Sequence, residues 1–450
     1  METNQSRRSF IKTVGAGTMG LTIGGVLPGF SASSYNHIIG ANNRVNMAVI
    51  GINIRGDQLA PNFARLSDAC EVVTICDVDK RAVEKGIATV KGVQTRAPKG
   101  EKDIRKVLAD KQVDAIAIAM PDHWHAPAAL LALQAGKHVY LEKPVSYCPR
   151  EGEMVIEARA KYGKVIQVGT QRRSYPKLKE AMQELHNGVI GKIHYGKACY
   201  VNSRGSIGRG KVAPVPDWLD WDLWQGPAPR TAYRDNIVHY NWHWFWHWGT
   251  AETLNNGTHT ADLLCWGIKP KFPTKVSSIG GRYYFDDDWE TPDTQIVNIE
   301  FGNEASILME IYSCSGRTAD NSWGSTVFYG DKGSMVLSGS DEYKIYDKGN
   351  KLIKEVHSEI VDNTAKGFSK GDVSEMLHLG NFLDAILKGA TPNAPVEGGH
   401  KATLLMQLAN ISQRTGRILN INPADGRIVN DSEAQRLWSR SYEPGWEPKI

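Results

Sequence analysis

The stretch RVNMAVIGINIRG, residues 44–56, decides the fold of the N-terminal half of this chain. Its apolar run, residues 45–50, predicts a buried strand, and the pattern G-x-N-x-x-G that follows predicts a tight turn into a helix. The next apolar run, EVVTICDVD, brings Asp77 21 residues after the last glycine of that pattern. This order is typical of a βαβ unit that binds a dinucleotide with its pyrophosphate at the helix N-terminus.

Two residues of this unit bear on the cofactor. Asn53 replaces the middle glycine; asparagine tolerates a positive φ, although its side chain takes space that the pyrophosphate normally uses. Asp77 would bind ribose hydroxyls and repel a 2′-phosphate, so the sequence favours NAD over NADP. A plain α/β domain without a cofactor is the alternative.

A second match to the fingerprint, GAGTMG at residues 15–20, is not a nucleotide site. No strand precedes it, and no acidic residue lies between Glu2 and Asp57. It lies within a segment that has paired arginines, Arg7 and Arg8, and then a glycine-rich apolar run. We interpret residues 1–34 as a twin-arginine export signal, which predicts a periplasmic protein without stable membrane insertion after cleavage. The alternative is an ordinary disordered or membrane-anchoring N-terminus.

Strands and helices continue to alternate up to residue 171. VDAIAIAMP, KHVYLEKP and KVIQVGTQRRS are further strands, separated by helical patterns. The alternation predicts a parallel, doubly wound Rossmann domain over residues 44–171, whose ligands bind at the carboxyl ends of the strands. The candidate cofactor residues are Gly51, Asn53, Ile54, Arg55, Gly56, Asp77, Pro121, Asp122, His123, His125, Glu142, Lys143 and Gln171.

The second half of the chain has a different pattern. After Gly191 long β-rich runs follow one another, separated by turn signals such as FGNE and YGDKG. We expect an α+β domain over residues 172–372, completed by C-terminal helices and a tail over residues 373–450. The net charge is only +4 and no dense basic stripe is present, so nucleic acid is not expected as a partner. The six cysteines form no CxxC pair and are expected to be mostly buried thiols, although a Cys70–Cys76 disulfide stays open.

Several motifs together resemble the Gfo/Idh/MocA family of glucose–fructose oxidoreductases and inositol dehydrogenases. They are PDHWHA, AGKHVYLEKP, QVGTQRRS, LDWDLWQGPAP (219–229), NNGTHTADLLCW (255–266) and HLGNFLDAILKG (378–389). The resemblance implies a Rossmann domain that holds NAD(P). It also implies a C-terminal α/β domain with a large open, mainly antiparallel sheet, used for substrate binding and for a homo-oligomer, either a dimer or a tetramer. We expect the NAD to be tightly bound, because free NAD is scarce outside the cytoplasm.

Four residues are candidates for the chemistry. Lys143 follows a strand in an apolar setting that would lower its pKa, and in the family this lysine shuttles a proton or binds the substrate hydroxyl; a structural ion pair is the alternative. Asn255 and His259 are four residues apart and would share a helix face. The resemblance makes His259 the general acid or base. Asn255 stands where several relatives have Asp, which leaves it an orienting role, and Asp262 could support His259 or Lys143.

The tryptophans gather in one region, since seven of the 13 lie between residues 218 and 248. They could form a hydrophobic plug or oligomer interface, or a wall that stacks on a sugar ring, and both can hold. The substrate candidates are Arg172, Tyr195, Arg204, Tyr233, Arg234, Trp242, His243, Trp244 and His247. Neither PDHWH nor the spaced histidines His239, His243 and His247 make a recognised ligand set, so no metal is predicted.

The sequence thus predicts an exported NAD-dependent oxidoreductase. It would oxidise or reduce a hydroxyl or keto group on a small carbohydrate (a sugar, glycoside or cyclic polyol), with Lys143 and His259 handling the proton. The alternative is an NAD-dependent glycosidase of the α-N-acetylgalactosaminidase type, which uses transient oxidation, elimination, hydration and re-reduction. A carbohydrate-binding protein with a vestigial Rossmann domain is disfavoured, because both proton carriers are present.

Overall fold

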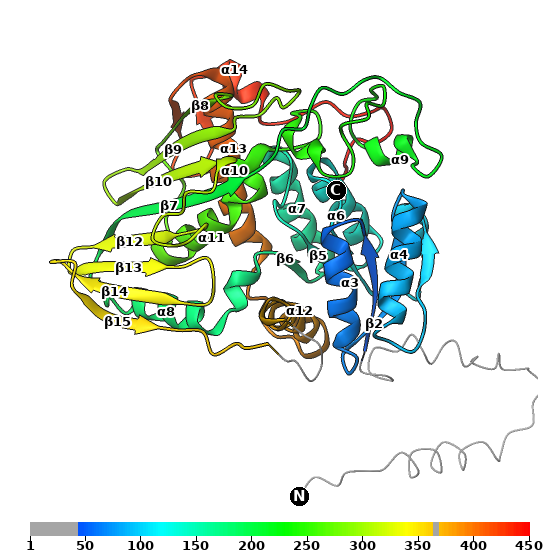
Figure 1. Cartoon of the computed structure of the whole chain (residues 1–450), viewed down its shortest axis with the longest axis horizontal. Helices are drawn as coiled ribbons and strands as arrows, with labels where there is room; N and C mark the ends of the chain where they lie inside the picture. The colour runs from blue at the N-terminus through cyan, green and yellow to red at the C-terminus, as the bar shows by residue number, and fades with distance from the viewer. Residues whose placement is uncertain (1–43, 363–368) are drawn as a thin grey trace, which may run out of the picture. The chain divides into compact units, whose positions relative to one another are not determined.

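The computed structural model describes residues 44–362 and 369–450, and the predicted export signal lies outside these residues. The N-terminal sheet has six parallel strands in the order β3-β2-β1-β4-β5-β6 (Figure 1). Its strands are β1 (Val45–Ile50), β2 (Cys70–Cys76), β3 (Lys99–Glu101), β4 (Ala115–Ile118), β5 (His138–Leu141) and β6 (Ile166–Val168). Its helices are α3 (Arg55–Arg65), α4 (Lys80–Lys91), α5 (Ile104–Ala109), α6 (Asp122–Gln134) and α7 (Pro149–Tyr162). The order reverses between β1 and β4, where doubly wound sheets bind their ligands.

The second sheet has 11 strands and confirms the predicted large, mainly antiparallel sheet. Only β7 and β10 pair in parallel; the other ladders are antiparallel. Its strands are β7 (Ile193–Ser203), β8 (Lys275–Gly281), β9 (Thr294–Phe301), β10 (Ala305–Tyr312), β11 (Cys314–Ser315), β12 (Thr326–Gly330), β13 (Gly333–Leu337), β14 (Tyr343–Asp347), β15 (Leu352–Val356), β16 (Leu419–Ile421) and β17 (Ile428–Val429).

A layer of helices joins the two sheets. Helix α13 (Val396–Thr415) packs against β8 on one side and α7 on the other, and α11 (Gly257–Ile268) packs on β7. Helix α12 (Lys370–Lys388) begins with a capping box of Ser369 and Asp372 and packs on α3, where Phe382 contacts the rings of Phe63 and Tyr140. The remaining helices are α8 (Pro176–His186), α9 (Trp221–Gln225), α10 (Ala251–Asn255), α14 (Ser432–Arg436) and the single turns η1 (Gln171–Ser174) and η2 (Asn241–Trp244).

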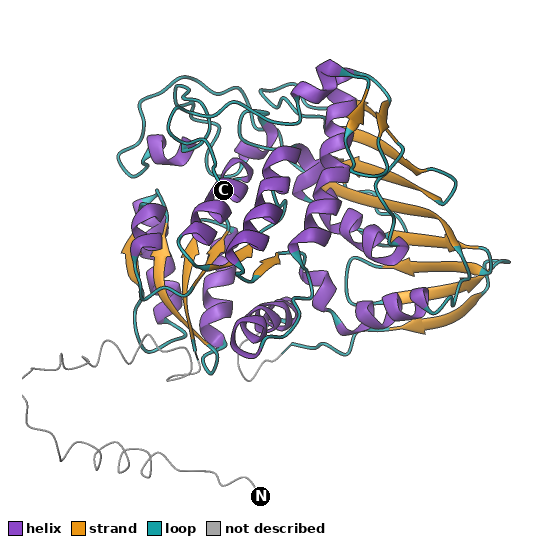
Figure 2. Ribbon diagram, turned by 180° about the vertical axis from the view of Figure 1, so that it is seen from behind, coloured by secondary structure: helices purple, strands orange, loops and turns teal. Residues whose placement is uncertain are grey.

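The large sheet buries only one of its faces. Along β9, Val297, Ile299 and Phe301 are buried in the core that includes α8, α11 and α13, whereas the alternate residues Ile296 and Asn298 remain half-buried. Figure 2 shows these strands along one edge of the ribbon with the helices inside them. This alternation is typical of a sheet that is packed on one side only.

Two further observations concern the cysteines and the helices. All six cysteines lie in the described part and are free thiols, so the structure has no Cys70–Cys76 disulfide. Five of them are buried, as predicted, and Cys314 is half-buried. Within residues 44–362 and 369–450, no helix combines the length and apolar character needed to cross a bilayer.

Candidate active site

A cavity of about 460 Å³ opens at the carboxyl ends of β1, β2, β4 and β5 and extends to the loops of the second domain. From the predicted sets it is lined by Gly51, Asn53, Ile54, Arg55, Asp77, Pro121, Asp122, His125, Glu142, Lys143, Asn255, Trp242 and His243. Two halves of the chain that are far apart in sequence therefore share one site. This is the arrangement expected when a nucleotide and a second substrate must meet.

The turn after β1 packs closely on the backbone that follows β4, and this requires a glycine at residue 51. This residue has a φ of +79°, and a Cβ there would lie 2.6 Å from the backbone oxygen of Ala119. Helix α3 then starts without a side-chain cap, so its first amides are available to an anion. Asn53 does not adopt a positive φ, and its place in the turn therefore does not depend on the conformation that asparagine tolerates.

Asp77 lies at the end of β2 on the cavity wall. Its two carboxylate oxygens accept hydrogen bonds from the amides of Ile52 (2.7 Å) and Asp79 (2.9 Å), which fix its position beside the turn. Burial raises the pKa of Asp77, while these amides oppose that effect. The glycine turn, the uncapped helix and the fixed carboxylate together fit the pyrophosphate and ribose of NAD.

Arg55, in the first turn of α3, links three parts of the structure. Its Nε lies 2.8 Å from Glu142 at the end of β5, and its Nη2 pairs with Glu375 of α12. Burial alone would lower the pKa of Arg55, but the two carboxylates raise it overall. Arg55 lines the cavity, but its charge is already balanced by Glu142 and Glu375. It therefore holds the cofactor turn to α12.

Lys143 meets Asn255 across the two domains. Its Nζ donates a hydrogen bond to the backbone oxygen of Asn255 and lies 3.4 Å from the Oδ1 of the same residue. Burial lowers the pKa of Lys143. Asp122, on the same cavity, accepts a hydrogen bond from Thr250, and burial raises the pKa of its carboxyl. A fixed amine with a lowered pKa beside a nucleotide cavity is suited to proton transfer.

The segment that carries Asn255 and His259 is not one continuous helix. Helix α10 ends at Asn255 and α11 begins at Gly257, because Asn256 leaves helical geometry with φ −123° and ψ −28°. The expected sharing of one helix face therefore does not apply. His259 lies in the first turn of α11, where burial and the positive charges of Lys143, Arg172 and Arg55 hold its pKa well below the usual range. Its Nδ1 is buried without a hydrogen-bond partner.

Asp262 has a different partner from the one expected. Both of its oxygens accept from Nε of Arg173, at 2.7 and 2.9 Å, and its residue is only 1% exposed. The carboxylate therefore fixes the turn η1 to α11 and is not hydrogen-bonded to His259 or Lys143. The two charges compensate each other inside the core, which makes this pair structural.

The aromatic stretch 241–249 divides between the cavity and the core. Trp242 and His243 line the cavity; their rings stack at 3.6 Å, and His243 Nδ1 lies 2.6 Å from the Tyr240 backbone oxygen. Burial holds the pKa of His243 well below its usual range. Trp244 points away and stacks on Trp289 at 4.0 Å, with 1% exposure. The turn is a 3-10 helix with three residues per turn, so Trp244 points in a different direction from Trp242 and His243.

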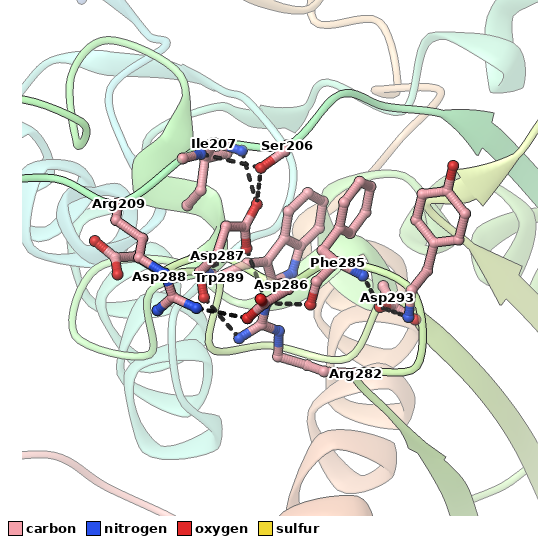
Figure 3. Close-up of polar contacts among 12 residues, drawn as sticks. Ser206, Ile207, Arg209, Arg282, Phe285, Asp286, Asp287, Asp288, Trp289 and Asp293 are labelled. Atoms are coloured by element: carbon pink, nitrogen blue, oxygen red, sulfur yellow. Dashed lines mark hydrogen bonds and ion pairs between the residues drawn. The ribbon is translucent and has the colours of Figure 1, made fainter.

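The loop between β8 and β9, drawn in Figure 3, carries Trp289, on which Trp244 stacks. Asp287 accepts from Ser206, from the amide of Ile207 and from Arg282, so it joins this loop to the segment after β7. Phe285 stacks on Trp289 at 4.8 Å, which extends the Trp244 stack. Trp244 is therefore part of a rigid support.

The other predicted residues do not line the cavity, and their contacts show why. Tyr195 stacks on Tyr329 on the outer face of the large sheet, Arg204 pairs with Glu252, Tyr233 packs on Trp221, Arg234 pairs with Asp288, and His247 bonds the Pro229 oxygen. His123 contacts the oxygen of Trp224, and Gly56 lies against the backbone of Gly51. Gln171 and Arg172 lie in η1, beside α11. The spaced histidines bond three different partners, since His239 contacts Asp79.

Some cavity residues were absent from the predicted set. Lys102 and Asp103 follow β3, and Leu223 and Trp224 come from α9. Strand β3 is only three residues long, Lys-Gly-Glu, so it has no apolar run to reveal it. The rule that ligands bind after each strand would have found Lys102 if that strand had been recognised.

Comparison with known proteins agrees with this geometry. Residues 45–170 match the model of an oxidoreductase family with an NAD-binding Rossmann fold (Gfo/Idh/MocA), and residues 219–421 match the C-terminal alpha/beta domain of the same family. Among solved structures, levoglucosan dehydrogenase in complex with NADH superposes with a TM-score of 0.66 at 17% identity, covering 84% of this chain and 99% of that one. The WlbA dehydrogenase from Bordetella pertussis, with NADH and UDP-GlcNAcA, gives 0.62 at 18% identity, with the same coverage.

The curated relatives match only part of this chain and only part of their own length. A glycosyl hydrolase family 109 protein from Saccharopolyspora erythraea is 26% identical over 51% of this chain and 55% of its own length. Inositol 2-dehydrogenase 4 from the same organism is 29% identical over 34% of this chain and 44% of its own. An α-N-acetylgalactosaminidase from Shewanella oneidensis is 24% identical over 44% and 46%. The chain thus spans about half the length of the curated relatives it matches.

Proposed function

Because this chain belongs to the Gfo/Idh/MocA oxidoreductase family, we propose that it is an NAD-dependent enzyme that oxidises or reduces a hydroxyl or keto group on a sugar, glycoside or cyclic polyol. The observation that carries the proposal is Lys143, a buried lysine whose Nζ is fixed by Asn255 on the wall of the nucleotide cavity. An inositol dehydrogenase among the relatives and a levoglucosan dehydrogenase among the structural neighbours support the substrate class.

Some residues of the chain bind the cofactor and others transfer the proton. NAD, when bound, supplies the hydride acceptor or donor. The turn at Gly51 and the carboxylate of Asp77 hold and select the dinucleotide. Nζ of Lys143 takes the proton of the reacting hydroxyl, or returns it. Burial lowers the pKa of this amine, so its neutral form is more populated than in an exposed lysine. His259, whose Nδ1 has no hydrogen-bond partner among the described residues, serves as a second proton carrier.

A single preparation tests this proposal. The full chain loaded with NAD is incubated with a panel of sugars and polyols, and NADH formation is followed by its near-UV absorbance. Replacing Lys143 by Met should lower kcat/KM by roughly 100- to 10,000-fold, the usual contribution of acid–base catalysis. The matched control is Lys106→Met. The side chain of Lys106 is 67% exposed, so this change should leave kcat/KM unaltered. An unchanged rate in Lys143→Met would refute the role of this lysine.

The second candidate is a glycosidase that uses NAD transiently. It is favoured by the relatives named as glycosyl hydrolase family 109 and α-N-acetylgalactosaminidase. Release of the aglycone from nitrophenyl glycosides, with no net formation of NADH, would identify this reaction. Net NADH formation without aglycone release would identify the dehydrogenase.

Two further proposals concern the setting of the enzyme. The paired arginines and apolar run of residues 1–34 support export to the periplasm by the twin-arginine route. The half-buried outer face of the large sheet, which includes Ile296 and the exposed Ile279, supports a homo-oligomer formed through that sheet. Sedimentation of the purified protein measures its oligomeric state and so tests the second proposal.

A further inference from the structure

Arg172 is a buried cation without an acidic partner among the described residues. The residue is 5% exposed and takes part in no ion pair there. The other arginines with similarly buried side chains all pair with acids: Arg173 with Asp262, Arg204 with Glu252 and Arg440 with Glu151, at 2.6 to 2.7 Å. Arg172 is thus an exception to a pattern that the rest of the molecule follows.

The surroundings of its guanidinium leave space for the charged group. Its Nη1 is buried and has no hydrogen-bond partner. The ring of Trp323 lies 4.9 Å from the guanidinium carbon, and a Cβ at Gly324 would come within 3.3 Å of Nη2, so this glycine leaves the group its space. Burial lowers the pKa of Arg172, and the negative charge of Asp262, which pairs with Arg173, opposes this effect. A buried charge without compensation is strongly unfavourable, and such sites commonly receive the compensating charge from a ligand.

Other buried polar atoms without partners occur in the two residues before Arg172 and in the segment that carries Asn255 and His259. Buried atoms without partners are also found in Thr170 (Oγ1), Gln171 (Oε1), Asn255 (Nδ2) and His259 (Nδ1). The turn η1, which carries Arg172, contacts α11, which carries His259, and the charge of Arg172 acts on that histidine. Most buried polar atoms in proteins have a hydrogen-bond partner, so a group without partners is a candidate binding site for a polar ligand.

The chemistry of these atoms identifies that ligand. Nη1 of Arg172 and Nδ2 of Asn255 are donors, and Nδ1 of His259 can be one, whereas Oε1 of Gln171 accepts a hydroxyl. A guanidinium binds a planar carboxylate in two-pronged geometry. Asn255 also connects this group to the reaction centre, since its backbone oxygen accepts from Lys143.

We propose that the substrate is an acidic sugar, a uronic acid or a glycuronide, whose carboxylate is bound by Arg172. Arg172 lies in η1 beside α11 and not on the wall of the cavity at Lys143, so the bound substrate extends from that cavity towards η1. The inference rests on the proposed function, because it assigns the substrate class of the site at Lys143. Among the acids on the cavity wall, Glu142 has its charge compensated by Arg55.

Direct binding tests the proposal without requiring turnover. The NADH-loaded full chain is titrated calorimetrically with matched pairs: methyl glucuronide and methyl glucoside, methyl galacturonide and methyl galactoside, and mannuronic acid and mannose. We expect at least one acid to bind about 100-fold more tightly than its neutral counterpart. Arg172→Gln should remove this preference, and Arg172→Lys should retain part of it. The matched control Arg96→Gln, whose side chain is 65% exposed, should keep it.

The outcomes separate the substrate class from the reaction. The inference is wrong if no acid binds more tightly than its neutral partner, or if Arg172→Gln keeps the preference. It is also wrong if sodium chloride or phosphate raises the Tm as much as the acidic sugar does, which would indicate an inorganic anion site. Should Arg172→Gln fail to fold, the wild-type pairs still decide, together with Gly324→Val, which presses on the guanidinium. Binding of an acid without any NADH formation or aglycone release would support Arg172 and refute the proposed reaction.

Discussion

At the scale of single residues, Asp77 illustrates how local sequence and burial combine. Its position after a strand marks it as the ribose-binding acid, and the structure fixes both of its oxygens with the amides of Ile52 and Asp79. An anion held rigidly on the cavity wall would lie close to the 2′-phosphate of NADP. Like charges at such short range disfavour each other by several kcal/mol when partly shielded from water.

Replacing Asp77 by Ser should therefore relax the choice of cofactor. We expect the ratio of kcat/KM for NADP over NAD to rise roughly 10- to 100-fold, because the repulsion is removed while a hydrogen-bonding side chain remains. Initial rates with both cofactors measure the ratio. The control Asp68→Ser, at an exposed position, should leave it unchanged. A ratio that does not move in Asp77→Ser would show that the carboxylate does not select the cofactor.

At the scale of elements, the turn from β1 into α3 is the part that the cofactor requires most. Gly51 needs its left-handed conformation, and it also has no free space for a side chain. Gly163, the cap of α7, has a similar φ of +63°, but a Cβ at this position would have no neighbouring atom within 4 Å. The two glycines therefore separate the conformational demand from the steric one.

Gly51→Ala and Gly163→Ala should differ in two respects. Gly163→Ala is expected to lose about 1 kcal/mol of unfolding free energy, because alanine resists a positive φ. Gly51→Ala should lose more, because its Cβ would also overlap the backbone of Ala119. Only Gly51→Ala should weaken NADH binding, by at least about 10-fold, since its Cβ would displace the Ala119 backbone beside the cofactor turn. Urea unfolding and NADH fluorescence titration measure the two quantities. Equal NADH affinity in both variants would contradict the assignment of the turn.

At the scale of the whole molecule, several histidines are buried in neutral form between the layers. Burial lowers the pKa of His378 and of His400 to about 4, and neither residue lies on the cavity wall. In the unfolded chain these groups titrate near pH 6.5. Folding therefore excludes protons that the unfolded chain binds between about pH 6.5 and 4, and the stability falls as the pH falls through that window.

The acid sensitivity can be assigned by substitution. Each buried histidine should cost about 1.4 kcal/mol of unfolding free energy per pH unit between pH 6.5 and 4, and nothing further below that range. His400→Leu should reduce the slope by that amount, whereas His357→Leu, with a side chain that is 71% exposed, should not. Urea unfolding at several pH values measures the slope. Identical slopes in the two variants would disprove the contribution of His400.

The sequence by itself determined the two domain types, the cofactor turn, Asp77 and Lys143, because these depend on local periodicity and on short motifs with fixed spacing. It also placed Trp242 and His243 among the substrate candidates. It could not tell them from Trp244, since which ring faces the cavity depends on the 3-10 turn and on the Trp289 stack. Strand β3 escaped because it is short and polar.

Only the tertiary structure decided the pairings that span the chain. Asp262 binds Arg173 where the sequence suggested His259 or Lys143, and Lys143 meets Asn255 over 112 residues of separation. Arg172 and Arg173 are neighbours in one motif, yet Arg173 has an acidic partner and Arg172 has none among the described residues. Such differences arise from which side chains converge in a buried space. No local sequence pattern predicts these contacts, because the partners come from elements that meet only after the two sheets have packed on the helices between them.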